Sequence, residues 1–438
     1  KVAESIVSKR AKTLFHIIIF FLIALAMGVF VHVCATLLTT AYNPEAVYPS
    51  ATLMVLALVV GWLVYRKNIS IWKITAVALA ITLLSVWLGI RLPTVDLTLG
   101  TWSILLLLYS LTASVLPVWV LLQPRDYLNS LLLYLGLACI FTGFFVLRPE
   151  FAAPALQTHP QGAPPLFPFV FIVVACGAIS GFHGLVSSGT TAKQINKESD
   201  ATFIGYGGMI GESLLGLASV LACTAGFLTR DLWMAHYNSW ELADGLGPNM
   251  QAFIDGSALF ISQLGLPLEV GKAFVALVAI SFALTTLDSA TRLLRFNISE
   301  MSETLRLPFL ANRYVASILA VTVIGSFAFY KVNGQAAGLA LWQLFGTTNQ
   351  ILGALTLLTI TLYLMQRGRP YWYTGVPMVF MLITTLTAMV IKIRDFWNSE
   401  TYLLLVLGVG IFLLSFWLGL EAVLRVRAGK VPSDHLTT

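Results

Sequence analysis

Apolar residues run through this sequence in long continuous stretches, without the short alternation expected of β-strands. Charged, Gly-rich or Pro-rich breaks separate the stretches, and roughly 20 apolar residues in a helix are enough to cross a bilayer. The pattern predicts an all-α membrane protein, a polytopic helical bundle of about 12 spans. The spans are expected at residues 13–39, 49–65, 71–90, 98–122, 127–147, 166–190, 204–228, 268–290, 310–330, 336–365, 372–391 and 402–424.

The composition supports this interpretation. Apolar residues make up 58% of the chain and charged residues only 11%, whereas an ordinary soluble domain carries roughly 25% charged residues. A soluble chain of this length would lack the charge to cover its surface. The four cysteines all lie inside apolar runs without metal-ligand spacing, so buried thiols are expected and no metal site is predicted from them.

The distribution of basic residues orients the predicted spans. With the N-terminus placed in the cytoplasm, the inner connections hold 19 of the 26 Lys and Arg residues and the outer connections hold 7. Basic residues accumulate on the cytoplasmic side of membrane proteins, and the bias keeps its sign along the whole chain. We expect a cytoplasmic segment at 1–12, one transmembrane domain at 13–424 and a cytoplasmic tail at 425–438. The basic excess is therefore topological, and no nucleic-acid partner is predicted.

Two outer connections are long. Residues 148–165 contain five prolines and are expected to be extended. Residues 229–267 contain Trp and Tyr residues, which favour the headgroup level of a bilayer. One or two amphipathic helices at the outer interface are predicted there, either as a lid over an outward-facing cavity or as plain interfacial packing.

A run rich in hydroxyl groups and glycine ends the sixth predicted span. It includes Ser180, His183, Ser187, Ser188 and Thr191. Hydroxyl oxygens suit Na⁺ coordination or carboxylate recognition, so this run is a candidate site. The structural alternative is a helix-packing seam whose hydroxyls bond to carbonyls of their own helix. His183 is either a proton carrier or a hydrogen-bonded core histidine.

A proline interrupts the fourth predicted span. Pro117 removes a backbone donor and clashes with the carbonyl of Ala113. The freed carbonyl, together with Thr112 and Ser114, is a candidate substrate contact, as in the broken helices of transporters. A simple proline kink is the alternative. The turn that follows contains Arg125 and Asp126, which are expected to form a surface pair.

Carboxylates inside predicted spans form a third group of candidates, because charge is costly within a bilayer. Asp288 is a candidate proton or cation site or part of an inner gate, and an ion pair with Arg292, four residues later, is the structural alternative. Glu212 lies about two turns into the seventh predicted span and is expected to be buried, where it would carry a proton.

A polar run in the tenth predicted span supplies the last candidates. Asn349 and Gln350 follow Thr347 and Thr348 there. Such a run is typical of hydrogen bonding between helices, and a substrate site is the alternative. The chain lacks the GxSxG, HExxH, Walker and GxGxxG motifs of common enzymes. The sequence therefore predicts a protein that is not an enzyme.

These motifs resemble, in order, those of the carbon starvation protein A family. The matching segments are Val115–Trp119, Pro124–Leu128, Leu166–Phe169, Ala175–His183, Ser187–Thr191, Phe203–Met209, Glu212–Ser213, Asp288, Thr291–Arg292, Leu344–Gly346 and Asn349–Gln350. The resemblance implies a bacterial inner-membrane secondary transporter that takes up peptides or pyruvate during carbon starvation. It implies coupling to an ion gradient, with H⁺ expected and Na⁺ as the alternative, and no cofactor.

The family also resembles the amino acid–polyamine–organocation superfamily, whose LeuT-like core contains two inverted five-helix repeats. This chain departs from the family pattern because an upstream broken helix and the helix after it are absent. The resemblance then implies that 98–122 is core helix six, which lines the substrate site. Span 166–190 becomes core helix eight, which places a Na⁺ site at Ser187 and Ser188.

The resemblance and the polar residues together define roles. Substrate binding is predicted at Thr112, Ser114, Pro117, Ser180 and His183. Ion or proton coupling is predicted at His183, Ser187, Ser188, Thr191, Glu212 and Asp288. Gate or helix contacts are predicted at Arg292, Asn349 and Gln350. A nutrient sensor with a transporter fold and a channel are the competing functional classes, and the lipid bilayer and a small solute are the expected partners.

Overall fold

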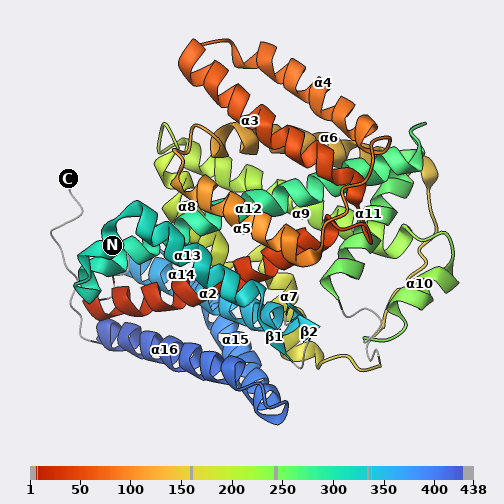
Figure 1. Ribbon diagram of the computed structural model, residues 1–438. Helices are drawn as coiled ribbons and strands as arrows, with labels where there is room; N and C mark the ends of the chain where they lie inside the picture. The colour runs from red at the N-terminus through yellow and green to blue at the C-terminus, as the bar shows by residue number, and fades with distance from the viewer. Residues whose placement is uncertain are drawn as a thin grey trace. The chain divides into compact units, whose positions relative to one another are not determined.

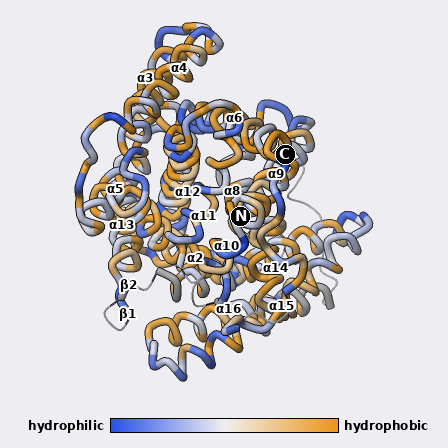
Figure 2. The backbone as a smooth tube through the Cα atoms, turned by 90° about the vertical axis from the view of Figure 1, so that its right-hand side faces the viewer, coloured by the Kyte–Doolittle hydropathy of each residue, from blue (hydrophilic) through white to orange (hydrophobic). Residues whose placement is uncertain are grey.

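The computed structural model of this chain is built almost entirely of helices (Figure 1). The structure describes residues 6, 8–157, 161–240, 245–332, 335–336 and 338–427. Its only strands in that part of the chain are β1 (Lys331–Val332) and β2 (Gln335–Ala336), which pair as a short antiparallel hairpin. Hydrophobic residues follow one another along the helices (Figure 2). Parts of the predicted cytoplasmic ends, at 1–5 and 428–438, lie outside the described residues.

The predicted class of a polytopic helical membrane protein is confirmed. Among the described residues, 10 helices are long and apolar enough to cross a bilayer, and two shorter apolar helices cover Leu99–Val115 and Arg313–Ala328. All twelve lie on predicted spans. The count of twelve crossings and the inverted repeat remain predictions.

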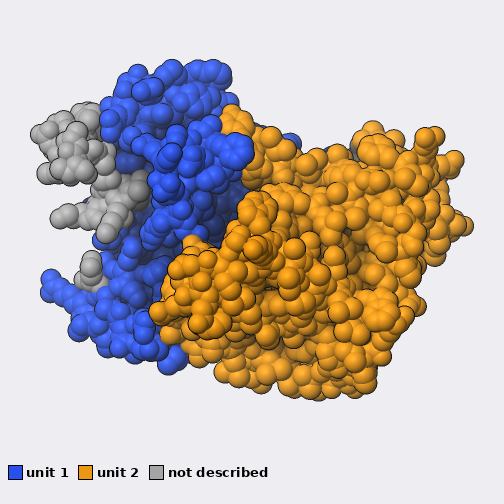
Figure 3. All heavy atoms as spheres, turned by 90° about the horizontal axis from the view of Figure 1, so that it is seen from above, with its two compact units in different colours: residues 1–28, 164–205, 293–438 blue, residues 29–163, 206–292 orange. Residues whose placement is uncertain are grey.

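The chain divides into two compact units, coloured separately in Figure 3. Unit 1 comprises residues 1–28, 164–205 and 293–438. In it, α14 packs against α7, α8, α15 and α16. Its elements are α7 (Leu166–Ala178), α8 (Gly181–Gly189), η2 (Thr191–Lys193), η3 (Pro308–Ala311), α13 (Arg313–Ala328), the hairpin, α14 (Gly338–Gln366), α15 (Trp372–Asn398) and α16 (Tyr402–Arg427).

Unit 2 comprises residues 29–163 and 206–292. In it, α6 packs against α3, α4 and α11. Its elements are η1 (Pro44–Ala46), α3 (Val47–Lys67), α4 (Ile71–Gly89), α5 (Leu99–Val115), α6 (Leu122–Leu147), α10 (Arg230–Tyr237) and α11 (Leu246–Ser262). Both units include residues of α2 (Lys9–Leu37), α9 (Asp200–Ala225) and α12 (Leu268–Leu305).

Thr98 and Pro117 set the two ends of helix α5. The Thr98 side chain accepts a hydrogen bond from the Thr101 amide at 3.2 Å and caps the first turn. At the other end Leu116 is extended, with φ −62° and ψ 147°, because a residue before proline disfavours the α region. The span predicted at 98–122 is therefore helical only to Val115, and the interruption predicted at Pro117 is confirmed. Residues 116–121 form a non-helical connection before α6.

The sixth predicted span is also interrupted. α7 ends at Ala178 and α8 begins at Gly181, so the continuous helix expected over 166–190 is wrong. Ser180 is extended, with φ −89° and ψ 140°, and its hydroxyl accepts a hydrogen bond from the Phe182 amide. An N-cap serine thus starts α8 in the middle of an apolar run. The eighth predicted span differs in the opposite sense, since α12 continues past residue 290 to Leu305.

The one or two helices predicted within 229–267 form as α10 and α11, and their position at the outer interface remains a prediction. Ile254, Phe260 and Ile261 of α11 are buried, so α11 belongs to the core of unit 2 and is more than a surface anchor. The described part of the proline-rich connection before α7, at 148–157 and 161–165, contains no helix, as predicted. The lid role of residues 229–267 remains a prediction.

The packing of α11 on α6 depends on Gly143. A Cβ atom at this position would overlap the carbonyl group of Phe260, whereas at Gly136, also on α6, the nearest heavy atom is Cε1 of Phe274 at 3.4 Å. We predict that Gly143→Ala destabilises the protein by about 1–3 kcal/mol through overpacking. Gly136→Ala is the matched control and is expected to unfold like wild type. Thermal unfolding of the purified protein in detergent compares them, and equal midpoints would contradict this account of the helix contact.

Candidate functional site

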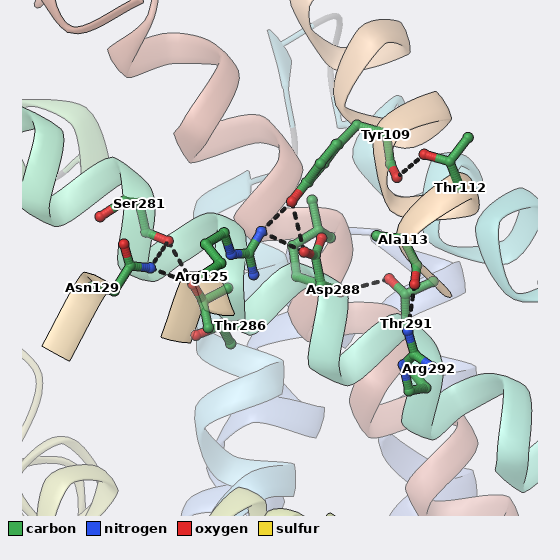
Figure 4. A network of polar contacts seen from close by, with 12 residues as sticks. Tyr109, Thr112, Ala113, Arg125, Asn129, Ser281, Thr286, Asp288, Thr291 and Arg292 are labelled. Atoms are coloured by element: carbon green, nitrogen blue, oxygen red, sulfur yellow. Dashed lines mark hydrogen bonds and ion pairs between the residues drawn. The ribbon is translucent and has the colours of Figure 1, made fainter. Parts of the chain in front are cut away.

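A buried ion pair lies inside unit 2, between α6 and α12 (Figure 4). The Arg125 Nη1 atom contacts Oδ2 of Asp288, and their side chains are 1% and 0% exposed. The Tyr109 hydroxyl, from α5, donates a hydrogen bond to the same Oδ2 atom at 2.7 Å and accepts one from Arg125 Nη1. Three helices therefore bring one cation, one anion and one phenol together away from solvent.

The break after α5 places Arg125. Because residues 116–121 are not helical, α6 starts at Leu122, and Arg125 falls in its first turn. The expected surface pair of Arg125 with Asp126 is wrong, since Arg125 is buried and its partner is Asp288. Burying a cation is costly without a counter-charge, and Asp288 supplies one from α12.

A second polar layer lies one helical turn away. Asn129, four residues after Arg125, donates from Nδ2 to the Thr285 hydroxyl at 2.7 Å and to the Ser281 carbonyl at 3.3 Å. Thr285 precedes Asp288 by three residues on α12. The facing sides of α6 and α12 are therefore joined by two successive polar contacts (Figure 4).

The carbonyl freed by the proline break has a specific partner. Nη2 of Arg292 donates to the Ala113 carbonyl at 2.5 Å. The expectation that Pro117 releases this carbonyl from the helix agrees with the structure, and the carbonyl accepts a hydrogen bond from a buried arginine instead. Among the other residues predicted here, Ser114 is buried and bonds to the Leu111 carbonyl at 2.8 Å. Thr112 and Pro117 are exposed, and the Thr112 hydroxyl bonds to the Tyr109 carbonyl.

Several polar atoms of this cluster have no hydrogen-bond partner among the described residues. They are Nε and Nη2 of Arg125, Oδ1 of Asp288 and Oδ1 of Asn129. An unsatisfied buried polar group costs roughly 1–3 kcal/mol, and native proteins leave few of them without a role. Two donor nitrogens and two acceptor oxygens within about one helical turn are thus left without a hydrogen-bond partner in the described part of the chain.

A second polar centre lies inside unit 1, at the break between α7 and α8. The amide of Asn349, on α14, accepts a hydrogen bond from the Phe182 amide at 2.9 Å and donates to the Ser180 hydroxyl at 2.8 Å. Gly181 fits against the Asn349 backbone. Gln350 donates to the Ile172 carbonyl at 3.3 Å, and its Oε1 has no partner in the described chain. Asn349 and Gln350 therefore hold the broken helix in place.

The remaining predicted residues of this part of the chain follow in α8 and in η2. His183, Ser187 and Ser188 are exposed, and both serine hydroxyls bond to the Gly184 carbonyl of their own helix. That is the arrangement expected of a helix-packing seam. Thr191 is partly buried in η2. The described residues contain no cluster of three or more His, Cys, Asp or Glu side chains suited to a metal.

Glu212 differs from its prediction. It is exposed in α9, and an added Cβ at the neighbouring Gly211 would have no atom within 4 Å. The expectation of burial is therefore wrong, because α9 starts at Asp200 and its buried residues, Ala218, Leu221, Ala222 and Ala225, all lie in its second half. A coupling role for this residue remains a prediction.

Sequence reasoning missed Tyr109, Arg125 and Asn129. Arg125 stood at a predicted span boundary, where an arginine ordinarily faces water. One signal was available in the sequence: Asp288 lies deep in an apolar run, and a buried carboxylate requires a cation or several donors. The sequence did not indicate which arginine would supply it.

The amide of Asn349 is expected to stabilise unit 1. We predict that Asn349→Leu lowers stability by about 1–3 kcal/mol, because it leaves the buried hydroxyl of Ser180 and the Phe182 amide with one partner fewer. Thr359→Val, also on α14, removes a hydroxyl that bonds only within its own helix and is the control. Thermal unfolding in detergent checks both, and a Thr359→Val loss as large as that of Asn349→Leu would contradict the assigned role.

The site and fold define a helical membrane protein with a buried charge cluster, and comparison with known proteins gives its family. The family model described as "Carbon starvation protein CstA" matches residues 1–239 and 244–388. The chain belongs to this family, and the recognition made from its motifs is confirmed at that level.

Named relatives of this chain are transporters, which are not enzymes. It is 34% identical over 342 residues to the "Peptide transporter CstA" of Escherichia coli K12, covering 66% of this chain and 48% of that protein. It is 31% identical over 360 residues to the "Pyruvate/proton symporter BtsT" of the same organism, covering 65% and 50%. The "Peptide transporter CstA" of Bacillus subtilis 168 is 28% identical over 383 residues, covering 78% and 63%. The chain spans about half the length of the first two relatives.

Among the solved structures that match is that of a manganese transporter from Eremococcus coleocola. It covers 97% of this chain and 88% of its own, at 14% identity and a TM-score of 0.27. This similarity is too weak to establish a common fold.

Proposed function

We propose that this chain forms part of a secondary active transporter that imports peptides or pyruvate-like small carboxylates by alternating access. Coupling is to an ion gradient, with H⁺ as the favoured ion, and expression belongs to carbon starvation. The protein resides in the bacterial inner membrane with both ends of this chain in the cytoplasm. Its relatives' names and the positive-inside distribution of its basic residues support this proposal.

The buried cluster of Arg125, Asp288 and Tyr109 carries the proposal. Charged groups at membrane depth are expensive and are typical of substrate and proton pathways. A purely structural role would be served as well by apolar residues, since replacing a buried ion pair by hydrophobic side chains is often neutral or stabilising. The presence of this buried pair, with unpartnered atoms on both members, therefore favours a role in binding or coupling.

The other proposed roles follow the LeuT-like arrangement. Ser114 and the backbone before Pro117 contact substrate, with Thr112, Ser180 and His183 as further contacts. Asp288 carries the coupled proton. His183, Thr191 and Glu212 are secondary coupling candidates, and Ser187 with Ser188 forms the Na⁺ alternative. Arg292, Asn349 and Gln350 hold the two helix breaks that alternating access would move.

Uptake into proteoliposomes tests this function. The full-length protein is supplied with labelled pyruvate and a labelled dipeptide under proton and sodium gradients imposed separately. A proton-coupled importer accumulates solute under the proton gradient alone. Accumulation under sodium alone would assign the other ion. A sensor would bind without accumulation, and a channel would equilibrate solute without concentrating it, so either result would overturn the proposal.

A further inference from the structure

The guanidinium of Arg125 uses one edge and leaves another unused. Nη1 contacts Asp288 and Tyr109, whereas Nε and Nη2 have no partner among the described residues. A guanidinium is planar, and within that plane the Nε–H bond and one Nη2–H bond point in parallel from one edge. Two parallel donors match the two oxygens of a carboxylate, which is why arginine recognises carboxylates bidentately. The unused edge of Arg125 is therefore a carboxylate-binding edge.

This edge is buried rather than solvated. Arg125 is 1% exposed, so its unused donors are not simply hydrated surface groups. Oδ1 of Asp288, 0% exposed, is likewise unpartnered in the described structure. Because such groups are costly to bury, a ligand that hydrogen-bonds to them binds with a more favourable free energy. The site is already desolvated, and the contacts of Nη1 hold it in position, so binding costs less in desolvation and ordering.

Charge balance links this edge to Asp288. A carboxylate bound to the free edge of Arg125 places a second negative charge beside an ionised Asp288, which shares the same guanidinium. One proton on Asp288 removes this repulsion. The free Oδ1 atom is where this proton binds, because Oδ2 already accepts hydrogen bonds from Tyr109 and Arg125. Carboxylate binding and proton uptake are then one electrostatic event.

We propose that Arg125 binds the carboxylate of the transported solute through Nε and Nη2, and that Asp288 takes up the coupled proton at Oδ1 when it does. This inference rests on the proposed transport function and names the substrate class as carboxylates. Pyruvate and the C-terminus of a peptide share only this charged group. One anchor therefore accounts for a family whose named members transport one or the other.

Other charged or titratable groups face Asp288, and their effects on the pH dependence of uptake have to be distinguished from its own. Cys34 of α2, Asp126 of α6 and Arg292 of α12 lie within electrostatic range. Arg292 is bonded to the Ala113 carbonyl, Cys34 is a buried thiol, and Asp126 is exposed. Asp126→Asn and Cys34→Ala are therefore expected to leave the pH dependence of uptake unchanged.

Ligand chemistry tests the proposal without any variant. Full-length wild-type protein in proteoliposomes takes up labelled alanyl-alanine, in competition with unlabelled alanyl-alanine or with its C-terminal amide. The acid is expected to compete at least tenfold better than the amide, because the amide lacks the second charged oxygen. Labelled pyruvate is tested in the same way against pyruvamide. Equal competition by acid and amide would overturn the carboxylate anchor.

A conservative variant tests the residue. Arg125→Lys keeps the positive charge beside Asp288 but removes the two-donor edge, and it is expected to raise the KM for both solutes by about 10- to 100-fold. Arg91→Lys is the matched control, because Arg91 is exposed and stacks over Trp87 outside the cluster. An unchanged KM in Arg125→Lys would overturn the assignment.

The two proposals fail in distinguishable ways. If wild-type protein takes up neither labelled solute, the transport function fails. If it takes up both while acid and amide compete equally and Arg125→Lys has a wild-type KM, transport stands and the anchor fails. Uptake that is independent of Arg125 but still proton-driven would leave a proton site without a carboxylate anchor.

Discussion

Asp288→Asn is expected to abolish proton-driven accumulation while preserving exchange of labelled for unlabelled solute across the membrane. The amide matches the carboxylate in size and imitates its protonated, neutral form, so a bound solute carboxylate remains compensated. It cannot release a proton, however, and the proton gradient then performs no work. The internal solute concentration should reach the external one and not exceed it. Uptake and counterflow in the same proteoliposomes measure both properties.

Asp255→Asn provides the control for that variant. Asp255 also pairs with a cation, Lys272, at 2.7 Å, but its side chain is 42% exposed and lies on α11. The Asp255→Asn variant is expected to accumulate solute to the same level as wild type. Full proton-driven accumulation by Asp288→Asn would contradict a coupling role for Asp288, and loss of both accumulation and exchange, with normal folding, would show a role in binding alone.

Arg125→Leu is expected to destabilise the protein by roughly 3–5 kcal/mol, because removing one member of a buried ion pair leaves the other charge uncompensated. The loss should shrink as the pH falls, since a protonated Asp288 carries no charge. The double variant Arg125→Leu with Asp288→Leu should recover most of the stability, because a well-packed apolar pair replaces the ions. Thermal unfolding in detergent at several pH values measures each variant.

Transport should not recover in that double variant. This variant lacks both Arg125, the carboxylate anchor, and Asp288, the proton carrier, although its helices pack against each other as in wild type. Recovery of stability without transport would separate function from folding at this site. Recovery of proton-driven uptake in the double variant would contradict the functional role of the pair, and a single variant as stable as wild type would contradict its burial.

Much of the fold follows from elementary constraints on the sequence. The bilayer thickness sets the length of an apolar run, so every predicted span contains helix, although 98–122 and 166–190 are interrupted and the helix at 268–290 continues to Leu305. The helix breaks were harder to predict. Pro117 indicates one break, but the sequence did not indicate that the non-helical connection continues to residue 121 and so places Arg125 in the first turn of α6. The break at Ser180 has no proline. It forms because Asn349, which is distant in the sequence, hydrogen-bonds to the Ser180 hydroxyl and the Phe182 amide.

The candidate site was predictable in its residue types more than in its pairings. Asp288 stands out because it is a carboxylate within an apolar run, and Asn349 because it is a polar residue in mid-helix. Their partners are set by tertiary packing: Arg125 and Asp288 are far apart in the chain, and α6 and α12 bring them together. Glu212 shows the converse, since position in a helix does not create burial without neighbouring helices.

In this mechanism, uptake of a carboxylate and uptake of a proton are one event at Arg125 and Asp288. Proteoliposomes containing the full-length protein and a trapped pH-sensitive dye test it most directly, with protein-free vesicles as the blank. Addition of alanyl-alanine outside, with no imposed gradient, is expected to acidify the interior in wild type but not in Asp288→Asn, and its C-terminal amide should acidify neither. Solute entry without acidification in wild type, or equal acidification in Asp288→Asn, would contradict the account.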